Sequence, residues 1–192
     1  GIHFLVGFLQ NEYYVIYEQL GVDLRIFIAT KEKTKVDIIF PDNSTTSFTL
    51  PADTVISLSI SNNYYNTKSE KVVKNAIEIN SDNPIVVYTF NSQERTSDSY
   101  TAIPISNWGT EYVIMSMPND QYTLSQPPHD IVDSLVNYTP RNSEFLVIAA
   151  YDSTVITFKP KVLTEAGKQI YNYYSVKLNK GETYLVKSYP TP

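Results

Sequence analysis

The chain has 192 residues and a net charge of −5, from 15 basic and 20 acidic residues, and it contains no cysteine. Disulfides and thiolate metal sites are therefore excluded. The acidic balance and the lack of a basic run argue against nucleic acid or a membrane surface as partner. No apolar run approaches the ~20 residues that a spanning helix needs, so no direct membrane insertion is expected.

In chain order, short apolar or alternating runs are separated by turn-forming residues, which predicts an all-β protein of roughly thirteen to fifteen strands. The predicted strands, with Gly7 as a bulge position, are residues 3–9, 13–17, 24–30, 35–40, 46–50, 54–60, 76–80, 85–90, 112–117, 144–150, 154–159, 171–178 and 183–188. Residues 46–50 and 54–60 are predicted to pair as a hairpin. Strands and turns at this spacing are typical of a sandwich or barrel.

Three polar regions interrupt these strands. Residues 61–74 are predicted to form a loop or one short helix, and residues 92–100 a polar loop. Residues 118–139 form the longest region without periodicity, in which residues 130–136 predict two helical turns, with Asp130 as N-cap. Because long loops in compact domains often carry function, 118–139 is a second site region.

The sequence also repeats itself. Residues 1–12 align with 109–120, residues 28–38 with 148–158, and residues 48–58 with 176–186, in the same order and with small shifts. We therefore predict two packed β-sandwich-like units, at residues 1–106 and 107–192, with short helical turns in loops. The second unit has no equivalent of residues 75–91 and is expected to be incomplete at its C-terminal end, either missing a strand or borrowing one. An open sheet edge is a place for strand addition. The competing interpretation is that any two β-hairpins look alike.

Signals for nucleophilic or metal chemistry are weak. His3 lies in an apolar strand and His129 follows two prolines, so both are better explained as structural or simply exposed. Oxygen ligands for calcium at Asp82-Asn83 or residues 98–100 lack the spacing of a calcium loop. We expect no catalytic residue, metal or cofactor.

A carbohydrate-active hydrolase that uses two carboxylates is kept as an alternative. The acidic residues near the centre are Glu94, Asp98, Glu111, Asp130 and Asp133. Their spacing selects no pair, so solvated loop charges explain them better.

Adjacent tyrosines at 13–14, 64–65 and 173–174 are more informative. Neighbours in a strand point to opposite faces, so each pair should leave one tyrosine exposed for recognition. The predicted ligand-binding residues, chosen from these pairs, the polar loops and the single tryptophan, are Tyr64, Tyr65, Arg95, Asp98, Tyr100, Trp108 and Tyr122. Asn43 and Asn137 begin N-glycosylation sequons, which matter only in a secreted eukaryotic protein.

Several motifs resemble one family. They are SDNPIVVYTFNS at 81–92, DSYTAIP at 98–104, WGTEYVIMS at 108–116, SEFLVIAAYDSTVITFKP at 143–160 and VKLNKGETYLVKS at 176–188. The chain resembles, over most of its length, the N-terminal domain of IgGFc-binding protein, a module of large secreted or surface proteins. The resemblance implies an extracellular, non-catalytic binding or adhesion module and supplies no catalytic residues.

Composition, repeat and resemblance together predict a module that contacts proteins or glycans at the cell surface, and no nucleic acid. The alternative is a structural subunit of an extracellular filament or sheath, which self-associates through a sheet edge. The hydrolase is a second alternative. A cleft with clustered acids would favour the enzyme, a flat tyrosine patch recognition, and a paired edge strand assembly.

Overall fold

The structure is a computed structural model that describes residues 1–11, 21–93, 96–116 and 142–189. These residues contain fifteen β-strands and two 3-10 turns, at Asn62–Tyr64 and Ile105–Asn107. The predicted all-β fold with short helical turns is thereby confirmed. The predicted strand at 13–17 and most of the second site region lie outside the described residues.

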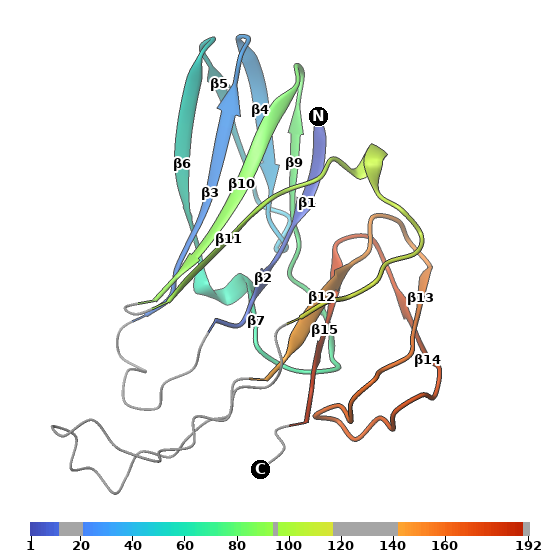
Figure 1. Ribbon diagram of the computed structural model, residues 1–192. Helices are drawn as coiled ribbons and strands as arrows, with labels where there is room; N and C mark the ends of the chain where they lie inside the picture. Colours follow the sequence, from blue (N-terminus) through green and yellow to red (C-terminus); the bar gives the residue numbers. More distant parts are fainter. Residues whose placement is uncertain (12–20, 94–95, 117–141, 190–192) are drawn as a thin grey trace, which may run out of the picture.

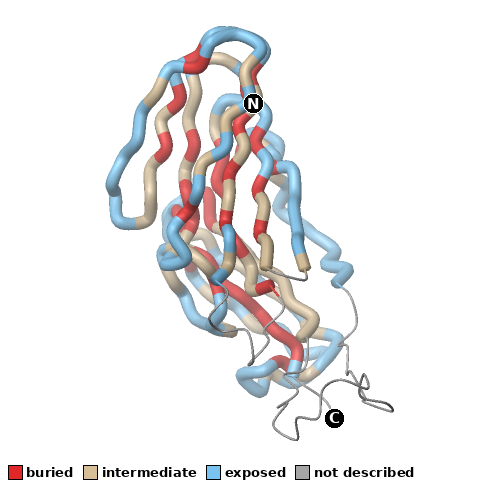
Figure 2. The backbone as a smooth tube through the Cα atoms, turned by 90° about the vertical axis from the view of Figure 1, so that its left-hand side faces the viewer, coloured by how far each residue is buried: buried red, intermediate tan, exposed pale blue. Residues whose placement is uncertain are grey.

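Two four-stranded antiparallel sheets form the N-terminal sandwich (Figure 1). One sheet has the order β1 (His3–Val6), β9 (Ile77–Ser81), β4 (Thr34–Ile39), β5 (Thr45–Leu50). The other has the order β11 (Ser97–Thr101), β10 (Ile85–Ser92), β3 (Asp23–Thr30), β6 (Thr54–Ile60). Buried and more exposed residues alternate along β3, β4, β6 and β10 (Figure 2), because successive side chains point to opposite faces.

The C-terminal lobe, residues 142–189, holds the remaining larger strands. β12 (Glu144–Ile148) pairs with β15 (Glu182–Lys187), and β15 also pairs with β8 (Val72–Lys74), which comes from the N-terminal part of the chain. β13 (Thr154–Phe158) pairs with β14 (Tyr174–Leu178). A parallel pair, β2 (Phe8–Leu9) with β7 (Tyr65–Asn66), lies where the two bodies meet.

The same nested pairing occurs twice. In the run β3 to β6, the outer strands pair with each other in one sheet and the inner strands pair in the other. The run β12 to β15 does the same, with β12 on β15 and β13 on β14. The chain therefore crosses between sheets at β3–β4, β5–β6, β12–β13 and β14–β15.

Four local predictions are wrong. The predicted hairpin of residues 46–50 and 54–60 does not form, because β5 and β6 lie in different sheets. Residues 112–116 form no strand and are exposed. The predicted polar loop contains β11, whose side chains are all exposed, so its polarity marks an edge strand. Residues 61–74 contain two short strands besides a 3-10 turn.

The sandwich and the lobe meet in a seam of polar and ionic contacts. Thr183 Oγ1 donates to Asn66 Oδ1 at 2.7 Å, and Asn66 Nδ2 donates to the Phe8 carbonyl at 3.0 Å. Lys180 Nζ lies 2.8 Å from Glu78 Oε1. An apolar cluster of Leu5, Ala76, Ile105 and Ala150 joins residues from both bodies. The predicted domain boundary at 106/107 stays a prediction. β8 belongs to the first predicted unit by sequence, but it pairs with β15 of the lobe.

Candidate binding surface

Two of the predicted ligand-binding tyrosines turn their hydroxyls into the protein. The Tyr100 hydroxyl accepts from the Gly7 amide at 3.1 Å and donates to the Gly7 carbonyl at 2.9 Å. About 40% of Tyr100 is exposed, but the hydroxyl end is enclosed, and this burial raises its pKa. The Tyr65 hydroxyl accepts from the Asn11 amide, and burial raises the Tyr65 pKa to about 12. Both side chains hold the segment around β2 in place.

The other predicted residues are spread over the molecule. Tyr64 stacks on Phe40, with ring centroids 5.8 Å apart. Asp98 is exposed on β11. Trp108 is half-buried and donates its indole N–H to the Ile103 carbonyl at 2.8 Å. Neither Tyr64 nor Tyr65 is exposed in the way predicted for a tyrosine pair.

Three positions fall outside the description. Arg95, Tyr122 and Asn137 lie outside the described residues, as does His129. Asn43 is exposed in the turn between β4 and β5, where its Oδ1 accepts from Lys74 Nζ at 2.7 Å. The structure therefore brings the described candidates to no common surface.

The pair Tyr173-Tyr174 behaves as predicted and leads to a better surface. Tyr174 points inward and its ring lies 5.9 Å from that of Phe158, whereas 72% of Tyr173 is exposed. Tyr173 stands on the outer face of the β13–β14 sheet, which we call the Tyr/Lys face. This face consists of Val155, Thr157, Lys159, Tyr173, Ser175 and Lys177.

Cross-strand contacts order the Tyr/Lys face. Lys159 Nζ lies 5.0 Å from the Tyr173 ring centroid, a cation–π contact. Thr157 and Ser175 are directly opposite each other and share a hydroxyl hydrogen bond of 2.8 Å. Val155 faces Lys177 across the sheet. Beyond the strand ends, Lys161 Nζ lies 5.1 Å from the Tyr171 ring centroid and extends the same pattern.

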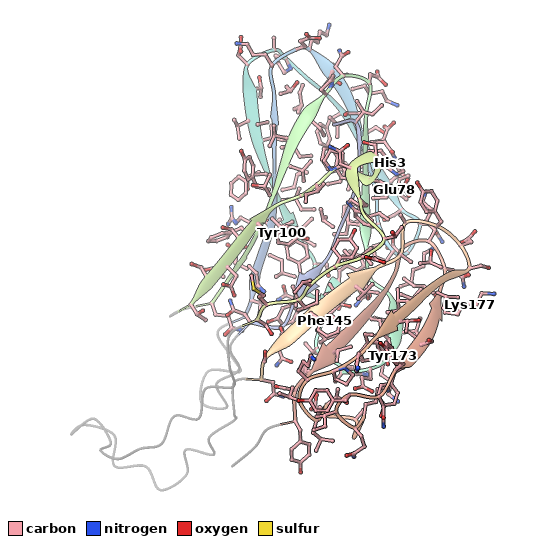
Figure 3. All side chains as sticks on the ribbon, turned by 45° about the vertical axis from the view of Figure 1, so that its right-hand side comes forward. His3, Glu78, Tyr100, Phe145, Tyr173 and Lys177 are labelled. Atoms are coloured by element: carbon pink, nitrogen blue, oxygen red, sulfur yellow. The ribbon has the colours of Figure 1, made fainter. Side chains whose placement is uncertain are left out.

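The Tyr/Lys face carries positive charge on an acidic chain. Two of its six side chains are lysines and none is a carboxylate, although the whole chain has a net charge of −5. A rigid tyrosine beside cations and small hydroxyls suits a partner surface that presents acidic groups. Figure 3 shows Tyr173 and Lys177 in the lobe, away from His3 and Glu78. Alternation in residues 171–178 could have identified this face, but the sequence analysis favoured the loops.

Glu144 is a titratable residue that the sequence analysis did not single out. It lies at the start of β12, and burial raises its pKa to about 7, although the nearby Lys187 opposes this shift. Glu78 differs from Glu144. Burial raises the pKa of Glu78, but the hydrogen bonds with Lys180 and His3 outweigh burial, so that the pKa of Glu78 is lowered overall. The difference arises because two cationic or ionisable donors bond Glu78 directly, at 2.8 and 2.7 Å.

Enzymatic and metal sites find little support within the described ranges. Of the five predicted carboxylates, Asp98 lies on β11 and Glu111 lies in the segment after Trp108, while the other three lie outside the description. Among residues 1–11, 21–93, 96–116 and 142–189, no group of three or more His, Asp or Glu side chains is placed to hold a metal ion. In the same ranges, no helix is long and apolar enough to cross a membrane.

Within the described ranges, the chain is an all-β domain that carries a tyrosine-bearing sheet face. Residues 98–190 match the family model of IgGFc binding protein, so this segment is similar to that family. The predicted resemblance is confirmed for this segment, which is just under half of the chain rather than most of it. The match contains the whole Tyr/Lys face, but not the motif at residues 81–92. No curated protein and no solved structure matches the chain.

Proposed function

We propose that this chain is a non-catalytic, extracellular module of a larger secreted or cell-surface protein, which binds a protein partner through the Tyr/Lys face. The observation that carries the proposal is the position of this face within the segment that matches a binding-protein family. The secreted location and the adhesive role rest on the character of that family. Recognition of acidic protein groups follows from the chemistry of Tyr173, Lys159 and Lys177.

The energetics of such a face are those of a small interaction hot spot. Tyrosine is enriched where interfaces are strongest, because it brings a large contact area with few rotatable bonds. Here Lys159 contacts one face of the Tyr173 ring, which restricts the ring before a partner binds. Loss of a central tyrosine from an interface costs about 2 kcal/mol, which is roughly thirtyfold in affinity.

The test uses two sets of probes, immunoglobulin G Fc, to which the family name points, and an array of glycans. The described chain and its variants Tyr173→Ser and Lys177→Glu are compared with Tyr88→Ser, an exposed tyrosine on β10. The proposal expects Fc binding that falls more than about tenfold in the two face variants and is unchanged in Tyr88→Ser. Binding of glycans alone, binding that ignores the face variants, or no binding to any probe would contradict it.

A second candidate, assembly into a filament or sheath, is favoured by one observation. Within the described residues, β12 and β13 each pair on one side only. Unpaired backbone groups of this kind are templates for another strand. Sedimentation over a wide range of protein concentration separates the two functions, because assembly requires association of the chain alone.

A further inference from the structure

The lobe reproduces the strand register of the sandwich at matching positions. With the alignment offsets of the repeat, each core pair of the sandwich falls on a core pair of the lobe. The matched pairs are Val36–Phe48 with Ile156–Val176, Thr34–Leu50 with Thr154–Leu178, Ile28–Ile56 with Val147–Tyr184, and Ile26–Leu58 with Phe145–Val186. The alignment of β3 with β12 and that of β4 with β13 differ by a one-residue shift, whereas β5 and β6 align with β14 and β15 without a shift between them.

The connecting turns match as well. Asn43 and Asp53, in the turns before and after β5, have φ angles of 67° and 55°. The equivalent residues before and after β14 are Tyr171 and Gly181, with φ angles of 64° and 79°. The Asn43 amide donates to the Phe40 carbonyl at 2.9 Å, and the Tyr171 amide donates to Pro160 at 2.9 Å. Unrelated hairpins would not be expected to share these left-handed positions.

Two strands that pair with the nested four-strand run in the sandwich have no described equivalent in the lobe. β10 pairs with the edge of β3 that faces away from β6. β9 pairs with the edge of β4 that faces away from β5. The corresponding sides of β12 and β13 pair with no strand in the described part of the chain. β9 and β10 are consecutive and join different sheets, so they form one strand–turn–strand segment, Ile77–Ser92.

The core of the lobe is open on that same side. Ile26, Ile28, Val36 and Ile38 are fully buried in the sandwich. Their lobe equivalents are only partly buried, and they are Phe145, Val147, Ile156 and Phe158. Burial of apolar area is the main driving force for adding structure to a sheet. A segment like β9–β10 would cover these side chains.

A stretch of four large apolar residues also lacks cover. Tyr112, Val113, Ile114 and Met115 are exposed, with 90% of Val113 and 92% of Met115 accessible. The repeat aligns residues 111–114 with β1, which pairs with β9 in the described part of the chain. The described residues contain no strand equivalent to β9 beside residues 111–114, and this accounts for the lack of a strand at residues 112–116.

We propose that the open sides of β12 and β13 form a docking site for a strand–turn–strand segment with the apolar alternation of Ile77–Ser92, supplied by polypeptide outside residues 1–192. One strand of this segment pairs with β12. The other pairs with β13 on one side and with residues 111–114 on its other side. Both strands present their apolar face to the half-open core of the lobe. This inference does not depend on the Tyr/Lys face.

The experiment supplies such a segment to the full chain. A copy of residues 75–93 is appended after Pro192 through about nine Gly/Ser residues, so that the connection from β15 to the copied β9 matches the sixteen residues between β6 and β9 and spans about 20 Å. One control carries the appended residues in scrambled order. A second carries Ile79→Asp and Val87→Asp in the appended copy only. Amide hydrogen exchange and light scattering are measured for each protein.

The proposal expects exchange in residues 144–148, 154–158 and 111–114 to slow about tenfold or more with the native segment, in a monomeric protein, and in neither control. Exchange in β3 and β4 should not change, since their partners are in place. Unchanged exchange in β12 and β13 would overturn the proposal. Protection of these strands in the unextended chain that grows with protein concentration would also overturn it, because a second copy would then occupy the site.

Discussion

The N-terminal sandwich and the C-terminal lobe contain the same nested four-strand arrangement, but they differ in what covers it. In the sandwich, β9 pairs with β4 and β10 pairs with β3, and the core side chains are fully buried. In the lobe, the equivalent side chains are partly exposed, and β8 is added instead on the far side of β15. The comparison teaches that strand pairing sets the register, whereas burial depends on neighbours that come from elsewhere in the polypeptide.

The outer faces of the inner strand pairs differ too. On β4 and β5, Lys35 and Ser47 both bond Asp37, so the charges satisfy one another. These hydrogen bonds, Ser47 first, lower the pKa of Asp37. On β13 and β14, the lysines of the Tyr/Lys face have aromatic and aliphatic neighbours instead. The first face satisfies itself, and the second is suited to a partner.

The largest expected effect on the free energy of unfolding comes from truncating a core side chain. Ile38→Ala in the covered core should lower the free energy of unfolding by about 4 kcal/mol, because a fully buried isoleucine leaves a cavity. Ile156→Ala in the open core should cost about 2 kcal/mol, since water already reaches part of the side chain. Chemical denaturation, followed by hydrogen exchange in each body, measures both. Equal losses would contradict the difference in cover.

The next largest effect on stability is expected at the seam between the sandwich and the lobe. The Glu70 side chain is 2% exposed and forms an ion pair with Lys168, while its amide donates to the Leu185 carbonyl at 2.6 Å. Glu70→Gln should destabilise the lobe by about 3 kcal/mol, because it leaves Lys168 without its buried counter-charge. Lys31→Gln, at an exposed ion pair with Asp53, is the control and should have no measurable effect. Similar stabilities for the two variants would argue against the seam as a stabilising contact.

Glu144 predicts a pH dependence that is specific to the lobe. The pKa of Glu144 is about 7 in the folded state and 4.5 in the unfolded state. Between these two pH values the folded state therefore holds a proton that the unfolded state has lost. The contribution of Glu144 to stability is therefore largest below pH 4.5 and is lost as the pH rises through 7. Glu144→Gln should unfold with a free energy about 2 kcal/mol higher than the parent at pH 8 and similar to it at pH 4.5.

The control for this pH dependence is Glu32→Gln, at an exposed position in the turn after β3. It should follow the parent at both values of pH. If Glu144→Gln also follows the parent at pH 8, ionisation of the Glu144 carboxyl carries no free-energy cost in the folded protein, and the predicted pH dependence is wrong.

The smallest effect comes from Glu78, and it has the opposite sign. Burial raises its pKa, but the hydrogen bonds from Lys180 and His3 outweigh burial and bring the pKa below 4.5. The stabilisation from Glu78 is thus present above pH 4.5 and is lost as the pH falls below it. Lys180→Met should cost about 1 kcal/mol at pH 7 and less at pH 3. A constant difference across this range would show that the Lys180 contact is not ionic.

Much of the fold could be predicted from sequence, because alternation defines strands locally. Strands β3, β4, β6 and β10 were predicted to within two residues of their ends. Sheet membership was not predictable in this way, since Pro51-Ala52-Asp53 looks like a hairpin turn but carries the chain to the opposite sheet. The edge strand β11 was missed because edge positions tolerate polar residues on both faces.

The site was predicted less well, for a physical reason. Tyr65 and Tyr100 looked like contact residues, yet each hydroxyl has a backbone partner that lies far away in the sequence. Tyr173 was identified by its pair with Tyr174, and its neighbour Lys159 became apparent only once β13 and β14 were paired. Residues 112–115 read as a strand because their composition suits one, but a strand also needs a partner.

The most direct test of the account is amide exchange in the unmodified chain at equivalent positions of the two bodies. Residues 25–29 and 34–38 in the sandwich are compared with residues 144–148 and 154–158 in the lobe, under native conditions and at low protein concentration. The account predicts that the lobe strands exchange at least about tenfold faster, because one side of each is unpaired. Equal protection in the two bodies would show that the lobe is already complete and would contradict the open-edge account.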